Sequence, residues 1–122
     1  MNLEFVHDGV AVTMPVWPYV ADGAPTPEAL EFVTSLIGRL DEIRRFAAQK
    51  KLLRLYNDSW LDENHKALNE DEFVANLTNP RVHVMDEIGA ATVYFDDGDM
   101  FAGHLVEVFM NEGKLVSAGI IG

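Results

Sequence analysis

Three aspartates and a histidine lie close together in the last third of the chain. Asp96, Asp97 and Asp99 are followed by His104 within VYFDDGDMFAGHLVEV, residues 93–108. Carboxylates and imidazoles bind metal ions and transfer protons in general acid–base catalysis. Asp and Gly are also the residues that tight turns between strands select. We favour the turn, and the alternative is a small hydrolase or metal-dependent enzyme built on these four residues.

The spacing of these residues argues against a metal site. A calcium-binding EF-hand loop needs alternating ligands and a closing Glu, and the stretch does not supply them. His104 and Glu107 are three residues apart on a predicted strand, so their side chains point to opposite faces. The sequence therefore predicts no bound metal and assigns no catalytic residue.

Other catalytic motifs are missing from the sequence. The absence of cysteine removes disulfides, thiolate nucleophiles and Cys-bound zinc. The histidines do not show HExxH spacing, the serines do not lie in a GxSxG elbow, and neither a P-loop nor GxGxxG occurs. We expect no cofactor. An acid–base pair of carboxylates stays open as chemistry, although no pair stands out.

The two tryptophans both fall in predicted loops. An aromatic residue in a loop either anchors the edge of the core or forms a hot spot for a partner, and we expect an anchor at both Trp17 and Trp60. Trp60 has Asp58, Asp62 and Glu63 around it. An acidic rim around an aromatic residue suits a partner rich in Arg or Lys. Our predicted binding residues are these four and the Asp96, Asp97, Asp99 and His104 group.

The formal net charge of −11 is unevenly distributed. Residues 1–56 hold 7 acids and 6 Lys or Arg, whereas residues 57–122 hold 13 acids and 3 Lys or Arg. This field repels nucleic acid and anionic lipid and favours a basic protein partner. The alternative is that the charge only keeps the protein soluble. Because no apolar stretch reaches the roughly 20 residues of a membrane span and no signal peptide is visible, we expect a cytoplasmic protein.

The residues that position these groups read as strands, then helices, then strands. Alternating apolar residues predict a hairpin over residues 3–16 with an Asp-Gly turn. A long helix begins at Thr26 and carries an apolar stripe, and the sequence leaves open whether it is continuous or broken near Gly38. A short second helix begins at Asn69, which forms a capping box with Glu72.

The last part of the chain predicts an antiparallel meander. Its strands cover about residues 82–85, 90–95, 104–110 and 115–121. We therefore expect one α+β domain, residues 1–122, in which an antiparallel sheet packs on the long helix. The predicted core joins Val93, Phe95, Leu105 and Phe109 of the sheet to Val33, Leu36, Leu40 and Ile43 of the helix.

Several runs of the chain also resemble a known family. They are GVAVTMPV, AAQKKLLRLYNDSWLDE, LNEDEFVANLTNPRVHV and ATVYFDDGDMFAGHLVEV, with SAGIIG at the end. The family consists of small bacterial proteins of unknown function that look like immunity proteins of polymorphic toxin systems or stand near such genes. The most specific pieces are residues 57–60, the turn 96–99 and the Gly103-His104 pair. Where the family tends to have Trp before that pair, this chain has Ala102.

Charge and resemblance together predict a non-enzymatic acidic binding protein. The resemblance implies an immunity protein that neutralises a basic toxin by covering its active surface. It brings no catalytic residues with it. A structural or regulatory homodimer is a third possibility, and the sequence does not specify the oligomeric state.

Overall fold

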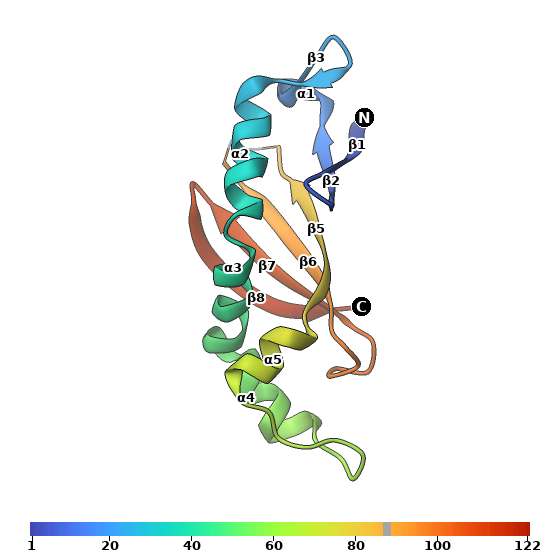
Figure 1. Cartoon of the computed structure of the whole chain (residues 1–122), viewed down its shortest axis with the longest axis vertical. Coiled ribbons are helices and arrows are strands. Elements are labelled where there is room, and N and C mark those ends of the chain that lie inside the picture. The colour runs from blue at the N-terminus through green and yellow to red at the C-terminus, as the bar shows by residue number, and fades with distance from the viewer. Residues whose placement is uncertain (87–88) are drawn as a thin grey trace.

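The chain forms a mixed sheet with helices packed against it (Figure 1). The computed structural model describes residues 1–86 and 89–122. In this part of the chain, the main sheet has the strand order β1-β2-β5-β6-β7-β8. Its strands are β1 (Asn2–His7), β2 (Val10–Pro15), β5 (Thr78–Val84), β6 (Ala91–Asp96), β7 (Leu105–Asn111) and β8 (Lys114–Ile121). The predicted α+β class, the N-terminal hairpin and the C-terminal meander are confirmed.

We had expected an antiparallel sheet, but one pair of strands in it is parallel. β2 pairs with β5 in parallel, with Val12 opposite Val82. The helices lie between these two strands in sequence, and a long crossover of this kind brings the chain back in the same direction. The hairpin and the meander are therefore joined into one sheet by a parallel pair. The Asp8-Gly9 turn of the hairpin has positive φ at both residues, as predicted.

Short elements connect the hairpin to the helices. They are α1 (Val16–Tyr19), β3 (Val20–Ala21) and β4 (Ala24–Pro25), and β3 and β4 form a separate two-stranded sheet. These elements lie at one end of the long axis of the molecule, and α4 with the loop after it lies at the other end (Figure 1). The sequence had shown this region only as a proline-containing loop.

The long helix is broken at Gly38, a point that the sequence had left open. α2 (Pro27–Ile37) begins at Thr26, whose hydroxyl oxygen accepts a hydrogen bond from the Ala29 amide at 3.2 Å. After the break, helical backbone continues through α3 (Leu40–Ala47), η1 (Ala48–Leu52), α4 (Leu53–Leu55) and η2 (Tyr56–Trp60), of which η1 and η2 are π-helical. The short helix α5 (Glu70–Asn76) has the predicted capping box between Asn69 and Glu72.

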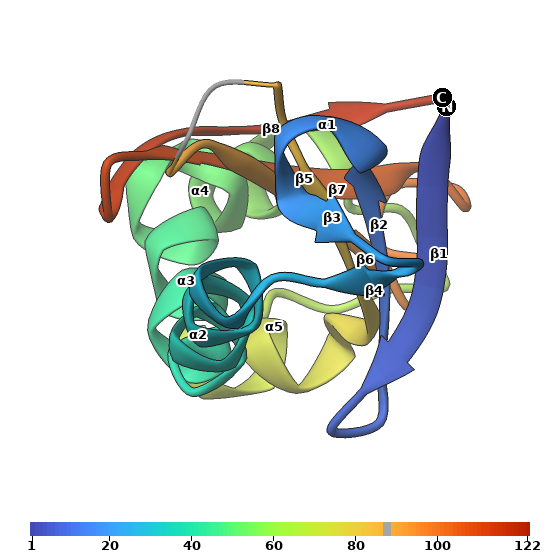
Figure 2. The same ribbon diagram turned by 90° about the horizontal axis from the view of Figure 1, so that it is seen from above.

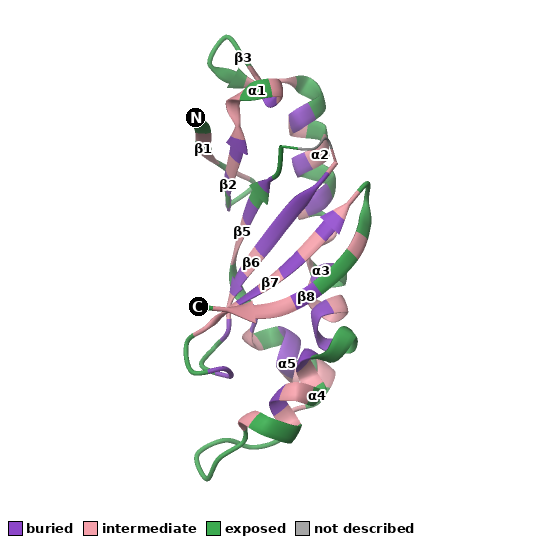
Figure 3. Ribbon diagram, turned by 180° about the vertical axis from the view of Figure 1, so that it is seen from behind, coloured by how far each residue is buried: buried purple, intermediate pink, exposed green. Residues whose placement is uncertain are grey.

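α2, α3 and α5 lie on one side of the sheet (Figure 2). The buried apolar residues form a core cluster between the helices and the sheet. Val33, Leu36, Ile43, Val93 and Phe95 are buried as predicted. β6 is buried along most of its length (Figure 3).

The predicted inner face of β7 was wrong. Leu105 and Phe109 are only half-buried, and the inward residues are Val106, Val108 and Met110. The pairing with β6 determines which residues of β7 face the core, because Val93 lies opposite Val108 and Phe95 opposite Val106. Leu40, on the helix side, is also only half-buried.

Candidate functional site

The loop between β6 and β7 is organised by the carboxylate of Asp97. This residue is only 4% exposed. Its Oδ1 accepts a hydrogen bond from the Asp99 amide at 2.8 Å, and its Oδ2 accepts from the amides of Phe101 at 2.8 Å and Gly103 at 3.1 Å. Backbone N–H donors of this kind stabilise a buried carboxylate. Asp97 therefore holds the loop together, and both of its oxygens are used in doing so.

Gly98 is the residue in this loop for which a side chain has no room. Its φ is +59°, a region that residues with a Cβ rarely adopt. A Cβ added there would lie 3.0 Å from the carbonyl oxygen and from Oδ1 of Asn76. The close approach of the loop to the end of α5 therefore depends on glycine at this position.

Phe101 fixes the loop to the helices. It is completely buried, and its ring makes edge contacts with Tyr56, Trp60 and Phe73 at centroid distances of 5.9, 5.4 and 6.3 Å. Sequence reasoning did not assign Phe101 a role. The signal was present, because Met100 and Phe101 form an isolated apolar pair in a polar loop, and both are buried.

His104 is held at the end of the same loop. Its Nδ1–H donates a hydrogen bond to the carbonyl oxygen of Phe101, and its ring makes an edge contact with Trp60 at 5.9 Å. A carbonyl oxygen has no proton to give, so Nδ1 must carry one. Nδ1 is therefore not available as a base or a metal ligand in this arrangement.

The other two aspartates differ from Asp97. Asp96 pairs with Arg81, with 3.1 Å between Nη2 and Oδ1, and its Oδ2 accepts a hydrogen bond from Asn79 at 3.2 Å. Asp99 is exposed and has a φ of +64°. Of the three, only Asp99 directs its carboxylate mainly to solvent.

These residues line one shallow depression of about 300 Å³, with Thr78 and the two glycines of the loop. Their carboxylates do not converge on one point, because Asp97 turns to backbone amides and Asp96 to Arg81. Among residues 1–86 and 89–122, no group of three or more Asp, Glu or His is placed to hold a metal ion. The arrangement offers a shaped surface with one exposed carboxylate rather than a proton-transfer pair.

The second predicted group lies at the C-terminal end of the long helical segment. Asn57 binds Leu68 in both directions, donating to its carbonyl oxygen and accepting from its amide, each at 2.9 Å. The Tyr56 hydroxyl donates to the carbonyl oxygen of Lys66 at 3.2 Å. These bonds return the loop over residues 61–69 to the helix, and Trp60 packs beside them on Phe101 and His104.

The acidic residues around Trp60 are all exposed: Asp58, Asp62 and Glu63. Asp62 accepts hydrogen bonds at Oδ1 from His65 Nδ1 at 2.7 Å and from the Asn64 amide at 2.8 Å. The His65 hydrogen bond is the main cause that lowers the pKa of Asp62 below its ordinary 3.8. Asp62 therefore stays ionised at neutral pH, while Asp58 and Glu63 face solvent.

Two arginines of the long helical segment, Arg44 and Arg45, bond to other groups of the protein. Arg44 donates to the carbonyl oxygen of Leu77 at 2.9 Å and lies over the Phe95 ring at 5.1 Å, and burial lowers its pKa. Arg45 bonds to carboxylates of two elements, and these hydrogen bonds raise its pKa. Its partners are Asp41, Glu70 and Asp71. The acids of α5 are thereby partly neutralised, unlike those around Trp60.

Trp17 does not anchor the core, contrary to our expectation. It is 85% exposed, whereas Trp60 is half-buried. The structure therefore joins Trp60 to the Asp96–His104 loop, whereas α1, which contains Trp17, lies at the other end of the long axis from α4 (Figure 1).

The fold and these two groups describe an α+β protein with an acidic, aromatic end. The chain belongs to a family described as an uncharacterized protein conserved in bacteria (DUF2262), whose model matches residues 22–120. The match leaves out β1, β2, α1 and β3. No curated protein and no solved structure matched the chain. Within residues 1–86 and 89–122, no helix is long and apolar enough to cross a membrane.

Proposed function

We propose that this protein is a non-enzymatic binding protein that recognises a basic protein through its acidic end, and that it acts as an immunity protein for a basic toxin. The acidic end consists of Asp58, Trp60, Asp62 and Glu63 together with Asp99. One observation carries the proposal. Trp60 packs on Phe101 and His104, so two acidic segments far apart in sequence belong to one end of the molecule.

The charges at this end support a basic partner. Asp58, Glu63 and Asp99 are exposed, and the lowered pKa of Asp62 keeps it ionised. Such a field attracts a cationic protein and speeds its encounter, and salt weakens the effect. The half-buried ring of Trp60 supplies the aromatic contact that interfaces favour. The immunity role has one further support, which is that the runs around residues 57–60 and 96–104 resemble those of immunity-like proteins.

The enzyme alternative has one observation in its favour, namely that Asp96, Asp97, Asp99 and His104 line the same depression. The hydrogen bonds of Asp97 weigh against it, because backbone amides occupy both of its carboxylate oxygens, whereas the Nδ1–H bond of His104 leaves Nε2 as the ring nitrogen that could act. Titration with Ca²⁺, Mg²⁺, Mn²⁺ and Zn²⁺ separates the two hypotheses. A rise of many degrees in Tm that Asp97→Asn abolishes would support the enzyme.

The binding experiment uses whatever toxin-like protein the neighbouring gene encodes. Association and dissociation rates are measured at low and high salt for the chain and for the triple variant Asp58→Asn, Asp62→Asn, Glu63→Gln. We expect the triple variant to associate about tenfold more slowly at low salt and to lose most of the salt dependence. Trp60→Ala should act mainly on dissociation.

A matched control removes the same number of charges elsewhere. Glu4→Gln, Asp22→Asn and Glu31→Gln change exposed acids outside the acidic end. This variant should bind almost as the unmodified chain does. Equal effects of the two triple variants would leave only a non-specific charge effect, and absence of binding at any salt would refute the immunity role.

A further inference from the structure

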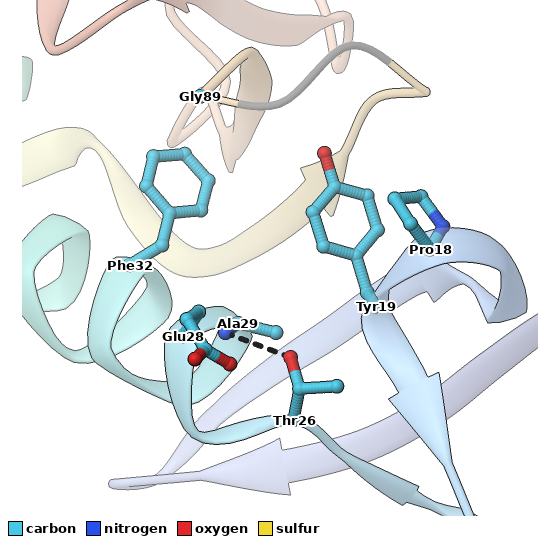
Figure 4. A pocket seen from close by; sticks show the side chains of 7 residues that line it. All are labelled: Pro18, Tyr19, Thr26, Glu28, Ala29, Phe32 and Gly89. Carbon is cyan, nitrogen blue, oxygen red and sulfur yellow. Dashed lines mark hydrogen bonds between the residues drawn. The ribbon is translucent and has the colours of Figure 1, made fainter.

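A cavity of about 240 Å³ lies at the end of the molecule opposite the acidic end. The residues that line it come from α1, from the start of α2 and from the segment before β6 (Figure 4). They are Pro18, Tyr19, Thr26, Glu28, Ala29, Phe32 and Gly89. Its volume equals that of roughly eight water molecules in the liquid, so a ligand with about as many heavy atoms fits.

The walls of the cavity are mainly apolar and aromatic. The rings of Tyr19 and Phe32 stand on either side of the opening, with Ala29 between them on the helix (Figure 4). Tyr19 and Ala29 are buried and Phe32 is half-buried. The Thr26 hydroxyl oxygen already accepts the hydrogen bond from the Ala29 amide. Such walls bind an aliphatic chain, and the faces of the two rings also attract a cation.

The charged groups around the cavity are carboxylates. Glu28 lines it and is exposed, and no Lys or Arg occurs among its described lining residues. The charge of Asp86 is also felt at the cavity. Burial is the main cause that raises the pKa of Tyr19, and the Asp86 carboxylate is the second. The first turn of α2 contributes only about half a positive charge from the helix dipole. Two carboxylates outweigh it, so the local field favours a cation over an anion.

We infer that this cavity binds an aliphatic cation, with the carbon chain between Tyr19 and Phe32 and the ammonium or guanidinium group at Glu28. This ligand chemistry occurs in free alkylamines and in the side chains of lysine and arginine. The site is separate from the acidic end, and the inference does not depend on the proposed function.

The test compares three probes with the same carbon chain and different head groups. n-Hexylammonium, n-hexanol and n-hexanoate are titrated into the full chain, and binding is located by amide chemical shifts of Tyr19, Ala29 and Phe32. We expect hexylammonium to bind about fivefold or more tightly than hexanol, and hexanoate to bind most weakly. Hexanol equal to or tighter than hexylammonium would overturn the inference, as would shifts that map elsewhere.

Substitution of Glu28 separates the charge from the cavity. Glu28→Gln should lower the affinity for hexylammonium to that for hexanol and leave hexanol binding unchanged. Glu31→Gln is the matched control, because Glu31 is an exposed acid on the same helix that does not line the cavity. An equal loss in both variants would show a general charge effect and refute the site. Ala29→Leu, which fills the floor, should abolish binding of both probes.

A further arm identifies the source of the cation. Lysine blocked at both its amino and carboxyl groups is titrated beside hexylammonium. Tighter binding of blocked lysine assigns the cavity to a protein side chain, and tighter binding of hexylammonium assigns it to a free amine. Either order supports the cation site, whereas binding of neither compound at millimolar concentration contradicts it.

Discussion

The two ends of this molecule each carry a tryptophan in a short helical segment, and the two side chains have opposite environments. Trp60 is half-buried, and its ring contacts Phe101 and His104 from a loop distant in sequence. Trp17 is 85% exposed, next to an apolar cavity lined by its neighbour Pro18. Both have a tyrosine within four residues in the sequence, at Tyr19 and Tyr56. The burial of such a tryptophan therefore depends on which segment, distant in sequence, packs against it.

The two ends also differ in how their polar groups are satisfied. At the Trp60 end, side chains bond to backbone: Asp97 holds its own loop, and Asn57 binds Leu68. Around the cavity, the Thr26 hydroxyl oxygen accepts a hydrogen bond from the Ala29 amide at the start of α2. We therefore expect substitutions of these bonded residues at the Trp60 end to lower stability more than substitutions around the cavity do.

Phe101→Ala should have the largest effect. The ring is completely buried between Tyr56, Trp60 and Phe73, so truncation leaves a cavity and costs about 3–5 kcal/mol of unfolding free energy. Chemical denaturation measures the loss. Val116→Ala is the control at an exposed apolar residue and should cost less than about 0.5 kcal/mol. A small loss at Phe101 would break the comparison, because the loop would then not be anchored.

Asp97→Ala should come next. Removing the carboxylate takes the acceptor from the amides of Asp99, Phe101 and Gly103, and we expect a cost of about 2–3 kcal/mol. Asp99→Asn removes the same charge from an exposed neighbour and should change stability by less than about 0.5 kcal/mol. Equal effects of the two substitutions in denaturation experiments would mean that charge, and not the hydrogen bonds of Asp97, sets the stability of this loop.

The tryptophans themselves give the direct test. Trp60→Ala should lower the free energy of unfolding by about 2 kcal/mol. The substitution removes the buried part of the ring and its edge contacts with Phe101 and His104. Trp17→Ala should lie within about 0.5 kcal/mol of the unmodified chain, since an exposed side chain loses little on truncation. Thermal and chemical unfolding of the two variants measures the contrast. Similar losses would remove the distinction between the ends.

The smallest effect concerns the acidic end at low pH. The hydrogen bond from His65 is the main cause of the lowered pKa of Asp62. A lowered folded-state pKa stabilises the protein above the unfolded value of about 3.9. That stabilisation is lost as the pH falls through the folded-state pKa. His65→Ala should move the pKa of Asp62 back toward 3.8, as followed by NMR titration of its carboxyl carbon. No movement would mean that the Asn64 amide alone lowers the pKa.

Much of the local structure could be predicted from the sequence. The caps at Thr26 and Asn69 and the Asp-Gly hairpin turn were confirmed, whereas the sequence had left open whether the helix breaks near Gly38. Each depends on hydrogen bonds or φ preferences within a few residues. The phase of β7 could not be predicted this way, because both of its faces carry apolar side chains. Pairing of Val106 and Val108 with β6 decides which face is buried.

The sequence indicated candidate residues and not their surroundings, and their part in binding stays a prediction. The sequence indicated the acidic turn and the acids around Trp60, and the structure places Trp60 against that turn. The sequence did not predict that Asp97 accepts hydrogen bonds from backbone amides or that Phe101 anchors the loop. Identical residue types at Asp96, Asp97 and Asp99 have different surroundings, and residue type alone cannot distinguish them.

The sequence by itself determined the α+β class, the order of most elements and the excess of acids in residues 57–122. Only the tertiary structure decided the parallel pairing of β2 with β5, the burial of Asp97 and the opposite environments of Trp17 and Trp60. The physical reason is the range of the interactions. Caps and turns form from neighbours along the chain, whereas the closing of loops between distant segments depends on the packing of the whole core.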